Sequence, residues 1–165
     1  MQKIKTIPTV EEAFNRLSAL CARQECCQSD LADKMMRQGM TETSVAQVLQ
    51  HLQSEGFVNE ERFARAFARD KLLFARWGKQ RISMELHRKR ISSQFIDGAL
   101  RQLDANEYKK VLKEVLYNYN KSLKAKSGYE RRMKLLRHAF GRGFSQDEAT
   151  EYVDELCGNA EDNDF

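Results

Sequence analysis

The sequence lacks most of the features that mark strand-rich, secreted or membrane-bound proteins. It has a single proline, Pro8, and no segment in which apolar and polar residues alternate as they do along a half-buried strand. No apolar run approaches the roughly 20 residues that a membrane span needs. The N-terminus also lacks the charged, apolar and small-residue pattern of a signal peptide. We therefore expect a helical, cytoplasmic protein with no membrane contact.

Cysteine and histidine are few, and their spacing does not suit metal or redox chemistry. The four cysteines form no C-x-x-C pair and the three histidines lie far apart in the sequence, whereas zinc sites usually need closely spaced ligands. The sequence also has no glycine-rich phosphate loop of the Walker type, no H-E-x-x-H and no G-x-S-x-G motif. We expect no metal, no cofactor and no catalytic residue, and therefore a protein that is not an enzyme.

What the sequence does contain is one apolar pattern that occurs three times, shifted by about fifty residues. In each copy, ten residues separate the first apolar anchor from a hydroxyl residue, and eleven separate that hydroxyl from the last anchor. Tandem repeats of this kind form long binding surfaces and need no catalytic pocket. The three copies are Leu31, Met35, Met40, Thr41, Val45, Leu49 and Leu52; Ile82, Leu86, Ile91, Ser92, Ile96, Leu100 and Leu103; and Leu135, Ala139, Phe144, Ser145, Ala149, Val153 and Leu156.

The spacing within each copy predicts two helices joined by a tight turn. Apolar residues at i, i+4 and i+7 form one stripe of an amphipathic helix. Thr41, Ser92 and Ser145 stand where the second helix of each pair would begin, and a hydroxyl there can accept a bond from an unpaired backbone N–H. Gly39 and Gly143 precede two of these caps and can adopt the left-handed conformation that ends a helix.

A further amphipathic stretch precedes each pair, and capping residues stand before it. Thr9 with Glu12, Asn59, and Asp104 with Glu107 are good helix N-terminal caps. We therefore predict an all-α fold of three tandem three-helix repeats that form an elongated, curved array. The predicted segments are a flexible N-terminal segment 1–8, repeats at 9–57, 58–104 and 105–157, and an acidic C-terminal tail at 158–165.

Positive charge is concentrated in the second and third repeats. Residues 1–58 carry 6 Lys or Arg against 7 Asp or Glu, whereas residues 59–104 carry 11 against 6 and residues 105–156 carry 11 against 8. If repeats stack in register, these side chains would line a basic stripe suited to phosphate or to an acidic protein groove; the alternative is an ordinary solvated face. One cluster contains Arg76, Lys79, Arg81, Arg88, Lys89 and Arg90, and the other contains Lys121, Lys124, Lys126, Arg131, Arg132, Lys134, Arg137 and Arg142.

Two motifs follow each other in the middle repeat. The first is a glycine-aromatic step that leads into an Asn-Glu-x-Arg-Phe-Ala helix start, and the second is Gly-x-x-Arg-Ile-x-x-Glu-Leu. In order and spacing they resemble the signature of the RecX family, whose members regulate the RecA recombinase. The motif residues are Gly56, Phe57, Asn59, Glu60, Arg62, Phe63, Ala64, Gly78, Arg81, Ile82, Glu85 and Leu86.

The chain departs from the family pattern at two places. Arg90 stands where the family usually has the glycine of Lys-Gly-Ile, and Cys27, Asp30 and Leu31 stand where repeat one usually has Ser, Glu and Leu. A side chain in a left-handed turn position costs about 1 kcal/mol relative to glycine. Arg90 therefore bears on the geometry of the turn before the last helix of repeat two.

The motif residues also have roles that follow from their own chemistry. Trp77 and Gly78 are expected in the turn between two helices, with Trp77 covering the core. Arg62 and Glu85 can be exposed, pair with neighbours or contact a partner. Gly98 inside a predicted helix indicates either a close helix approach or an error in the predicted span. The expected core residues are Phe63, Ala64, Phe67, Ile82 and Leu86.

The resemblance implies a monomeric, non-enzymatic regulator that binds the RecA filament on single-stranded DNA and lowers its recombinase, ATPase and co-protease activities. Single- or double-stranded DNA is a further candidate partner. A helix-turn-helix regulator that binds DNA directly and a scaffold that does not depend on the basic clusters remain alternatives. The residues expected to contact RecA or DNA phosphate are Arg76, Lys79, Arg81, Arg88, Lys89, Arg90, Lys124, Lys126, Arg131, Arg132, Lys134 and Arg137.

Overall fold

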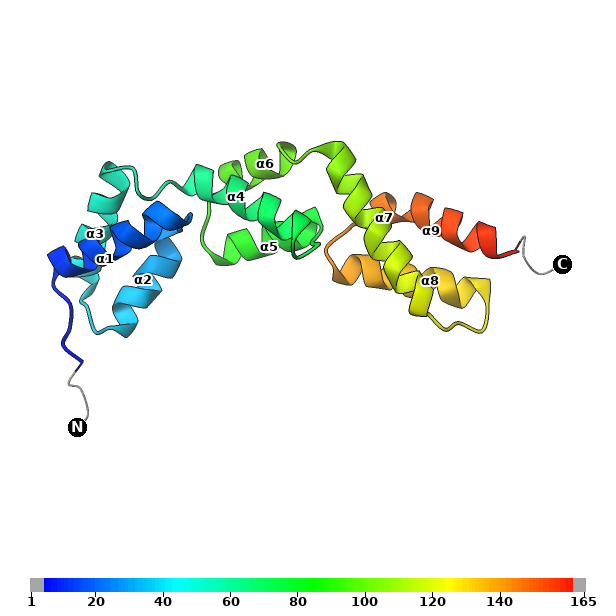
Figure 1. Ribbon diagram of the computed structural model, residues 1–165, viewed down its shortest axis with the longest axis horizontal. Helices are drawn as coiled ribbons and strands as arrows, with labels where there is room; N and C mark the ends of the chain where they lie inside the picture. Colours follow the sequence, from blue (N-terminus) through cyan, green and yellow to red (C-terminus); the bar gives the residue numbers. More distant parts are fainter. Residues whose placement is uncertain (1–4, 162–165) are drawn as a thin grey trace. The chain divides into compact units, whose positions relative to one another are not determined.

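The computed structural model describes residues 5–161, which form nine α-helices and no strand (Figure 1). The all-α prediction is therefore confirmed for this part of the chain. None of these helices is long and apolar enough to cross a membrane. The helices are α1 (Val10–Arg23), α2 (Gln28–Arg37), α3 (Glu42–Ser54), α4 (Glu60–Leu73), α5 (Lys79–Arg88), α6 (Ser93–Arg101), α7 (Ala105–Ser122), α8 (Gly128–Gly141) and α9 (Gln146–Glu161).

The helix limits at the two ends of the chain can be compared with the predicted end segments 1–8 and 158–165. Residues 5–9 precede α1 without helical structure, and Pro8 among them is buried. The last helix continues to Glu161, four residues into the segment 158–165 that we expected to be a tail. The remaining residues of the two predicted end segments, 1–4 and 162–165, lie outside the described residues.

Side chains at the helix N-termini explain where the helices begin. Thr9 Oγ1 accepts from Glu12 N at 3.1 Å, and the Glu12 carboxylate accepts from Thr9 N at 3.0 Å, which completes a capping box. Ser145 and Glu148 form the same arrangement before α9. Side chains that accept from a backbone N–H three residues on are also found at Thr41, Asn59, Asp104 and Ser127.

The turn before the third helix of each repeat uses the left-handed backbone region. Gly39 and Gly143 have φ values of 90° and 96°, as their position before a helix cap predicts. Arg90 occupies the equivalent position in the middle repeat with φ 60°. The substitution of arginine for glycine therefore leaves the turn conformation in place, and the chain bears the cost of a side chain there.

The repeated apolar pattern marks the core, with a shift at one position. The first four apolar anchors of each copy are buried. Leu49 and Leu100 are only half-buried, whereas Val48 and Ala99, one residue earlier, are 0% and 2% exposed. The core-facing stripe of α3 and α6 thus lies one residue before the predicted anchor.

Gly98 lies inside α6, as the predicted span placed it. A Cβ added at Gly98 meets nothing within 4 Å, so a close approach of another helix does not explain the glycine.

The described residues divide into two compact units that do not coincide with the predicted repeats. Unit 1 comprises the residues up to Ala66 together with Leu86–Ile96, and unit 2 comprises Phe67–Glu85 together with the residues from Asp97 onward. Each helix of the middle repeat, α4, α5 and α6, therefore contributes to both units. This division is expected of repeats that bury their apolar faces on neighbours rather than on themselves.

Unit 1 is organised around the packing of α3 against α1 and α2. Its buried side chains include Val48 and Leu52 of α3, both with 0% exposure. Phe14 and His51 stack with ring centroids 3.9 Å apart and an interplanar angle of 14°, closing one side of the cluster. The other buried members of this core are Ala13, Leu17, Cys26, Leu31, Met35, Met40, Val45 and Val58.

Unit 2 contains the packing of α7, α8 and α9 against one another. Helix α7 buries a stripe with helical spacing, and the ring centroid of Tyr108 at its start lies 5.4 Å from that of Phe144. Its buried residues are Tyr108, Val111, Leu112, Val115 and Leu116.

One cross-repeat connection lies wholly in unit 1, and we call it joint A. It is made by the start of α2 with Glu60, Lys89 and Arg90. Gln28 N donates to Glu60 Oε1 at 3.2 Å, and Ser29 Oγ donates to the Lys89 carbonyl at 2.7 Å. The joint is therefore held mainly by side chains.

The equivalent connection in unit 2, joint B, is made by backbone contact. It joins the start of α5 to the turn between α8 and α9. Gly78 N donates to the Arg142 carbonyl at 2.8 Å, and Gln80 N donates to the Gly143 carbonyl at 3.0 Å. A Cβ on Gly78 would overlap the Gly143 carbonyl and lie 2.5 Å from Phe144 N. Only glycine allows the two segments to approach this closely.

Candidate partner-binding surface

The first family-like motif acts as a structural element around the start of α4. Asn59 Oδ1 accepts from Arg62 N at 2.8 Å and so caps the helix. Arg62 turns back, donating from Nε to Glu25 at 2.5 Å and from Nη2 to the Gly56 carbonyl at 3.1 Å. Of the roles left open for Arg62, pairing with neighbours is the one that the structure shows. Phe63 and Ala64, at 7% and 0% exposure, belong to the core as predicted.

The second motif surrounds joint B. Gly78 is the residue that makes this joint possible, and Ile82 is fully buried, as predicted. Trp77 is half-buried, with the Arg81 guanidinium 4.3 Å and the Lys71 amine 4.9 Å from its ring centroid. Such cation–π contacts fix the tryptophan at the edge of the core. Its predicted place in the turn is thus confirmed.

The first basic cluster is divided between the two units. Arg76, Lys79 and Arg81 belong to unit 2, whereas the members at 88–90 belong to unit 1. In unit 2, Arg76 pairs with Glu114 at 2.6 Å, and the Lys79 amine lies 4.8 Å from the centroid of the Tyr108 ring. These two cations therefore already make contacts within the chain.

The unit 1 half of that cluster belongs to joint A. The Lys89 amine pairs with Asp30 at 2.6 Å, while the side chains of Arg88 and Arg90 are exposed. A small pocket of about 220 Å³ lies beside them, with Ser29 and Glu60 in its lining. Burial raises the pKa of the Glu60 carboxyl, and its Oε2 atom is buried without a hydrogen-bond partner.

The second basic cluster lies entirely in unit 2, and several of its members have internal partners. Arg131 donates to Asn120 at 2.6 Å, and Arg132 pairs with Asp154 at 2.9 Å. Lys134 pairs with Glu130 at 2.8 Å, a contact that lowers the pKa of that carboxyl. By contrast, the side chains of the remaining predicted binding residues in this cluster, Lys124, Lys126 and Arg137, are exposed.

A groove of about 730 Å³ runs between the end of α7 and helix α8. Lys124 lies on one side of it, and Lys134, Arg137 and Arg142 lie on the other. No Asp or Glu side chain is among the residues that line it. Four cations around one groove create a positive potential that attracts an anionic group.

Two further observations indicate that positive charge accumulates at this end of unit 2. The pKa of Arg142 is lowered by burial and by its neighbours Arg81 and Arg76. The pKa of His138 is lowered by burial and by Arg142, which favours the neutral form of the ring. It stacks on Tyr119 with ring centroids 3.9 Å apart and an interplanar angle of 5°. The groove thus has a cationic rim and an aromatic wall.

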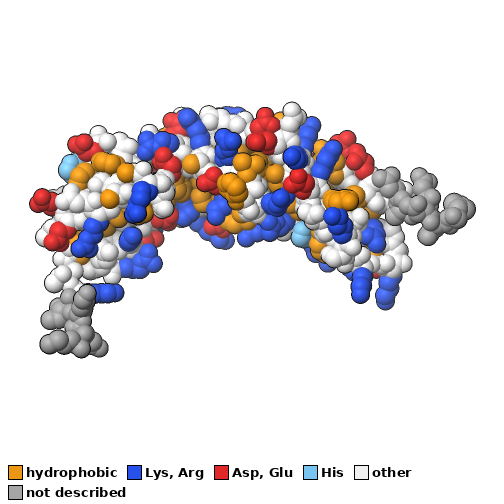
Figure 2. Space-filling model, in the orientation of Figure 1, with side chains coloured by type: hydrophobic (Ala, Val, Ile, Leu, Met, Phe, Trp, Pro, Cys, Tyr) orange, Lys and Arg blue, Asp and Glu red, His pale blue; other side chains and the backbone are white. Residues whose placement is uncertain are grey.

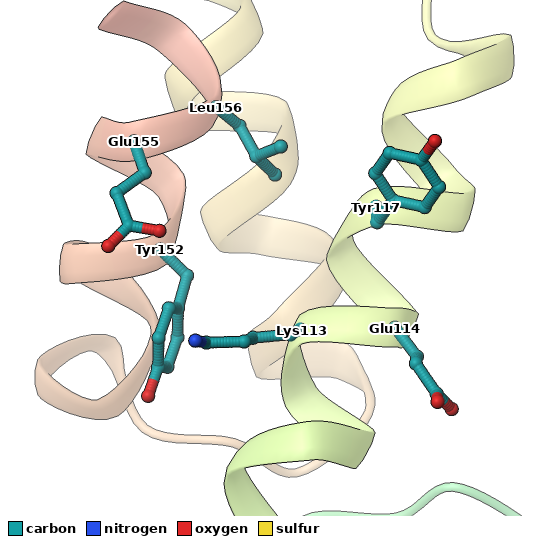
Figure 3. A pocket seen from close by; sticks show the side chains of 6 residues that line it. All are labelled: Lys113, Glu114, Tyr117, Tyr152, Glu155 and Leu156. Atoms are coloured by element: carbon teal, nitrogen blue, oxygen red, sulfur yellow. The ribbon is translucent and has the colours of Figure 1, made fainter. Parts of the chain in front are cut away.

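A second hollow, of about 290 Å³, lies between α7 and α9 (Figure 3). Tyr117 forms one wall and Tyr152 the other, with Leu156 between them. The Lys113 side chain extends across the opening, and its amine lies 4.7 Å from the centroid of the Tyr152 ring. Its size and apolar lining suit a single apolar side chain of a protein.

The structure brings together some predicted residues and leaves others separate. On the face shown in Figure 2, Lys and Arg side chains stand among Asp and Glu side chains. The groove gathers three residues from our predicted list, Lys124, Lys134 and Arg137, and adds Arg142. The Tyr119 and His138 stack was not predicted, since nothing in the spacing of residues 119 and 138 indicates contact. Among the described residues, no cluster of His, Cys, Asp or Glu is arranged to hold a metal ion.

Sequence comparison relates the chain to one family of regulators. The family described as RecX, second three-helix domain, matches residues 59–100. The regulatory protein RecX of Mycobacterium sp. (strain KMS) is 30% identical over 156 residues, which cover 92% of this chain and 85% of that protein. The regulatory protein RecX of Prosthecochloris aestuarii is 27% identical over 90% of this chain and 95% of its own length.

Structural comparison agrees with the sequence match. The crystal structure of RecX from Lactobacillus salivarius superimposes with a TM-score of 0.76 at 16% identity, covering 89% of this chain and 96% of that one. A crystal structure of regulatory protein RecX gives the same TM-score at 20% identity, covering 91% and 71%. These similarities show a shared fold, and the similarity to the mycobacterial protein extends over most of both chains. The chain therefore belongs to the RecX family of regulatory proteins.

Proposed function

We propose that this chain binds the RecA filament on single-stranded DNA and lowers its recombinase, ATPase and co-protease activities. The observation that carries the proposal is the groove between α7 and α8, where Lys124, Lys134, Arg137 and Arg142 meet with no carboxylate among the lining residues. A filament on DNA is anionic, and a cationic groove accelerates association with it. The chain acts by binding, with no chemical step of its own.

The arrangement of the cations favours the third repeat as the principal contact. Arg76 and Lys89 already pair with Glu114 and Asp30, so an acidic partner would have to compete with these internal carboxylates. Exposed ion pairs contribute little to stability and can be exchanged for a partner. Of the four groove cations, Lys134 alone pairs with a carboxylate in the described part of the chain, that of Glu130. We therefore rank the groove above the first basic cluster.

The test is the rate of ATP hydrolysis by RecA filaments in the presence of the chain. The groove variant reverses Lys124 and Arg137, together with Lys126 two residues beyond Lys124, to Glu. It should abolish most of the suppression, because the three side chains are exposed and contribute charge rather than packing. Suppression by the parent chain should weaken as salt rises, since exposed charges are screened beyond roughly 8–10 Å at physiological ionic strength.

A matched control reverses three exposed cations of unit 1, Arg16, Lys34 and Arg37, and applies the same change in net charge. This control should suppress ATP hydrolysis like the parent. If the groove variant, folded by circular dichroism, suppresses RecA as well as the parent does, the groove is a solvated face. If the parent binds DNA equally well without RecA and leaves ATP hydrolysis unchanged, the chain is instead a direct DNA-binding regulator.

A further inference from the structure

Helix α8 exposes an apolar stripe that the core of unit 2 does not use. Tyr129, Met133 and Phe140 are 75%, 39% and 66% exposed. They stand at i, i+4 and i+11, positions that fall on one face of a helix. Leu136 at i+7 lies on the same face between Met133 and Phe140 but packs in the core, with 8% exposure. The three exposed side chains therefore form one line of about 16 Å, at 1.5 Å per residue.

Arginines flank this stripe on both sides. At 100° per residue, Arg137 falls on one side of the line and Arg132 on the other. Arg132 donates from Nε to Asp154 at 2.9 Å, and its two terminal amino groups carry further N–H donors. Arg137 is exposed. Tyrosine, phenylalanine, methionine and arginine are the residue types enriched in protein interfaces.

We propose that this stripe is a docking site for an amphipathic helix of the RecA subunit, with apolar residues along its centre and carboxylates on its flanks. The proposal rests on the proposed function and adds the chemistry of the contact. An apolar ridge that is three turns long matches the face of a helix. The two arginines select a partner with acidic flanks, since bidentate Arg–carboxylate pairs give both orientation and affinity.

Charge argues against two other occupants. A second copy of this chain would place Arg132 and Arg137 against the same arginines, and like charges across an interface are disfavoured. A nucleic-acid strand would follow the cations of the groove, where the phosphate charge is met by Lys124 and Arg142. The stripe also places Met133, which has no ring to stack on a base, between its two aromatic residues.

Binding of the fluorescently labelled chain to RecA filaments on oligo(dT) tests this directly. Replacing Tyr129 and Phe140 by Ser should weaken binding by at least roughly tenfold, because aromatic anchors carry most of the energy of an interface. The matched control replaces Phe74 and Met84 by Ser, which are 81% and 57% exposed and also lie in unit 2. This control should change binding by less than about twofold, and both variants should melt like the parent.

A photo-cross-linking amino acid at Met133 then identifies what lies on the stripe. Cross-links to a RecA helix with Asp or Glu beside its apolar face support the proposal. Cross-links to the DNA or to another copy of this chain overturn it. If the parent binds filaments and the Tyr129 and Phe140 variant binds equally well, the docking site is wrong and the proposed function stands. If the parent itself does not bind filaments, both proposals fall together.

Discussion

Joints A and B connect equivalent positions of neighbouring repeats, yet they are built differently. In joint B the Arg142 carbonyl accepts from the backbone of Gly78 at 2.8 Å. In joint A the equivalent Lys89 carbonyl accepts instead from the side chain of Ser29 at 2.7 Å. The positions of Gly78 and Gly143 in joint B are occupied by Cys27 and Arg90 in joint A. Where both glycines are present, two backbones hydrogen-bond directly; where side chains replace them, a side chain makes the connection.

The two joints also differ in the group that accepts from the first backbone N–H of the helix, α5 in joint B and α2 in joint A. The N–H at the start of α5, on Lys79, donates to the Tyr108 hydroxyl at 3.0 Å, and this hydroxyl donates to Glu148 at 3.1 Å. Glu148 also accepts from Ser145 N in the capping box of α9. In joint A the equivalent N–H, on Gln28, donates to the Glu60 carboxylate, whose other oxygen is buried and unpaired. Joint B is therefore a fully satisfied network, and joint A carries an uncompensated polar atom, which costs free energy.

The largest expected effect comes from filling joint B. Gly143→Ala places a Cβ against the Cβ of Arg81 and 2.7 Å from Arg81 N, at a residue whose φ is 96°. Overpacking against backbone and a left-handed alanine together should lower the free energy of unfolding by about 3 kcal/mol or more. Urea denaturation measures the loss. Gly141→Ala in α8, where a Cβ meets nothing within 4 Å, is the control and should be neutral or stabilising.

A smaller loss is expected when the joint B network is cut without adding atoms. Tyr108→Phe removes the acceptor of Lys79 N and leaves that donor unpaired in a part-buried position. An unsatisfied group of this kind costs about 1–3 kcal/mol. Thermal melting of the variant tests the loss against Tyr117→Phe, whose side chain is 55% exposed. Equal melting temperatures for both variants would show that the hydroxyl contributes nothing to the joint.

At joint A the comparison predicts a gain. Arg90→Gly relieves the left-handed side chain at φ 60° and should raise the free energy of unfolding by about 1 kcal/mol. Arg90→Ala keeps the Cβ and should leave stability close to the parent, because the cost lies in the backbone. If Arg90→Ala raised the free energy of unfolding as much as Arg90→Gly does, the destabilisation would come from the arginine side chain and not from the backbone. Differential scanning calorimetry separates the two outcomes.

The smallest effect is a pH dependence confined to joint A. Burial raises the pKa of Glu60 above its ordinary value of 4.5, so the folded state binds the proton more tightly than the unfolded state. Stability contributed by Glu60 is fully present below that ordinary value and is lost as pH rises through the raised pKa. The free energy of unfolding of the parent relative to Glu60→Gln should therefore rise as pH falls from 7 toward 4.5. A difference that stays constant with pH would show that Glu60 does not titrate in this range.

Local regularities in the sequence were enough to determine the all-α fold and most of the helix limits. The threefold pattern has the period of an amphipathic helix, and the caps at Thr9, Asn59 and Ser145 act within three residues of themselves. Such signals are short in range, so they can be read from the chain directly. The left-handed turn at Arg90 also follows from its register with Gly39 and Gly143. The sequence was less informative about which basic residues are available to a partner, because their internal partners lie elsewhere in the chain.

Only the tertiary structure decided which residues meet across long stretches of chain. Gly78 and Gly143 are separated by 65 residues, and nothing local in either segment indicates that their backbones touch. The same packing brings Arg142 beside Arg76 and Arg81 and so concentrates charge that the sequence distributes over two helices. It also determines which side of α8 packs in the core and leaves Tyr129 and Phe140 exposed. The physical reason is that helix periodicity is set by neighbouring residues, whereas close approach depends on the small volume of glycine and the burial of apolar surface far along the chain.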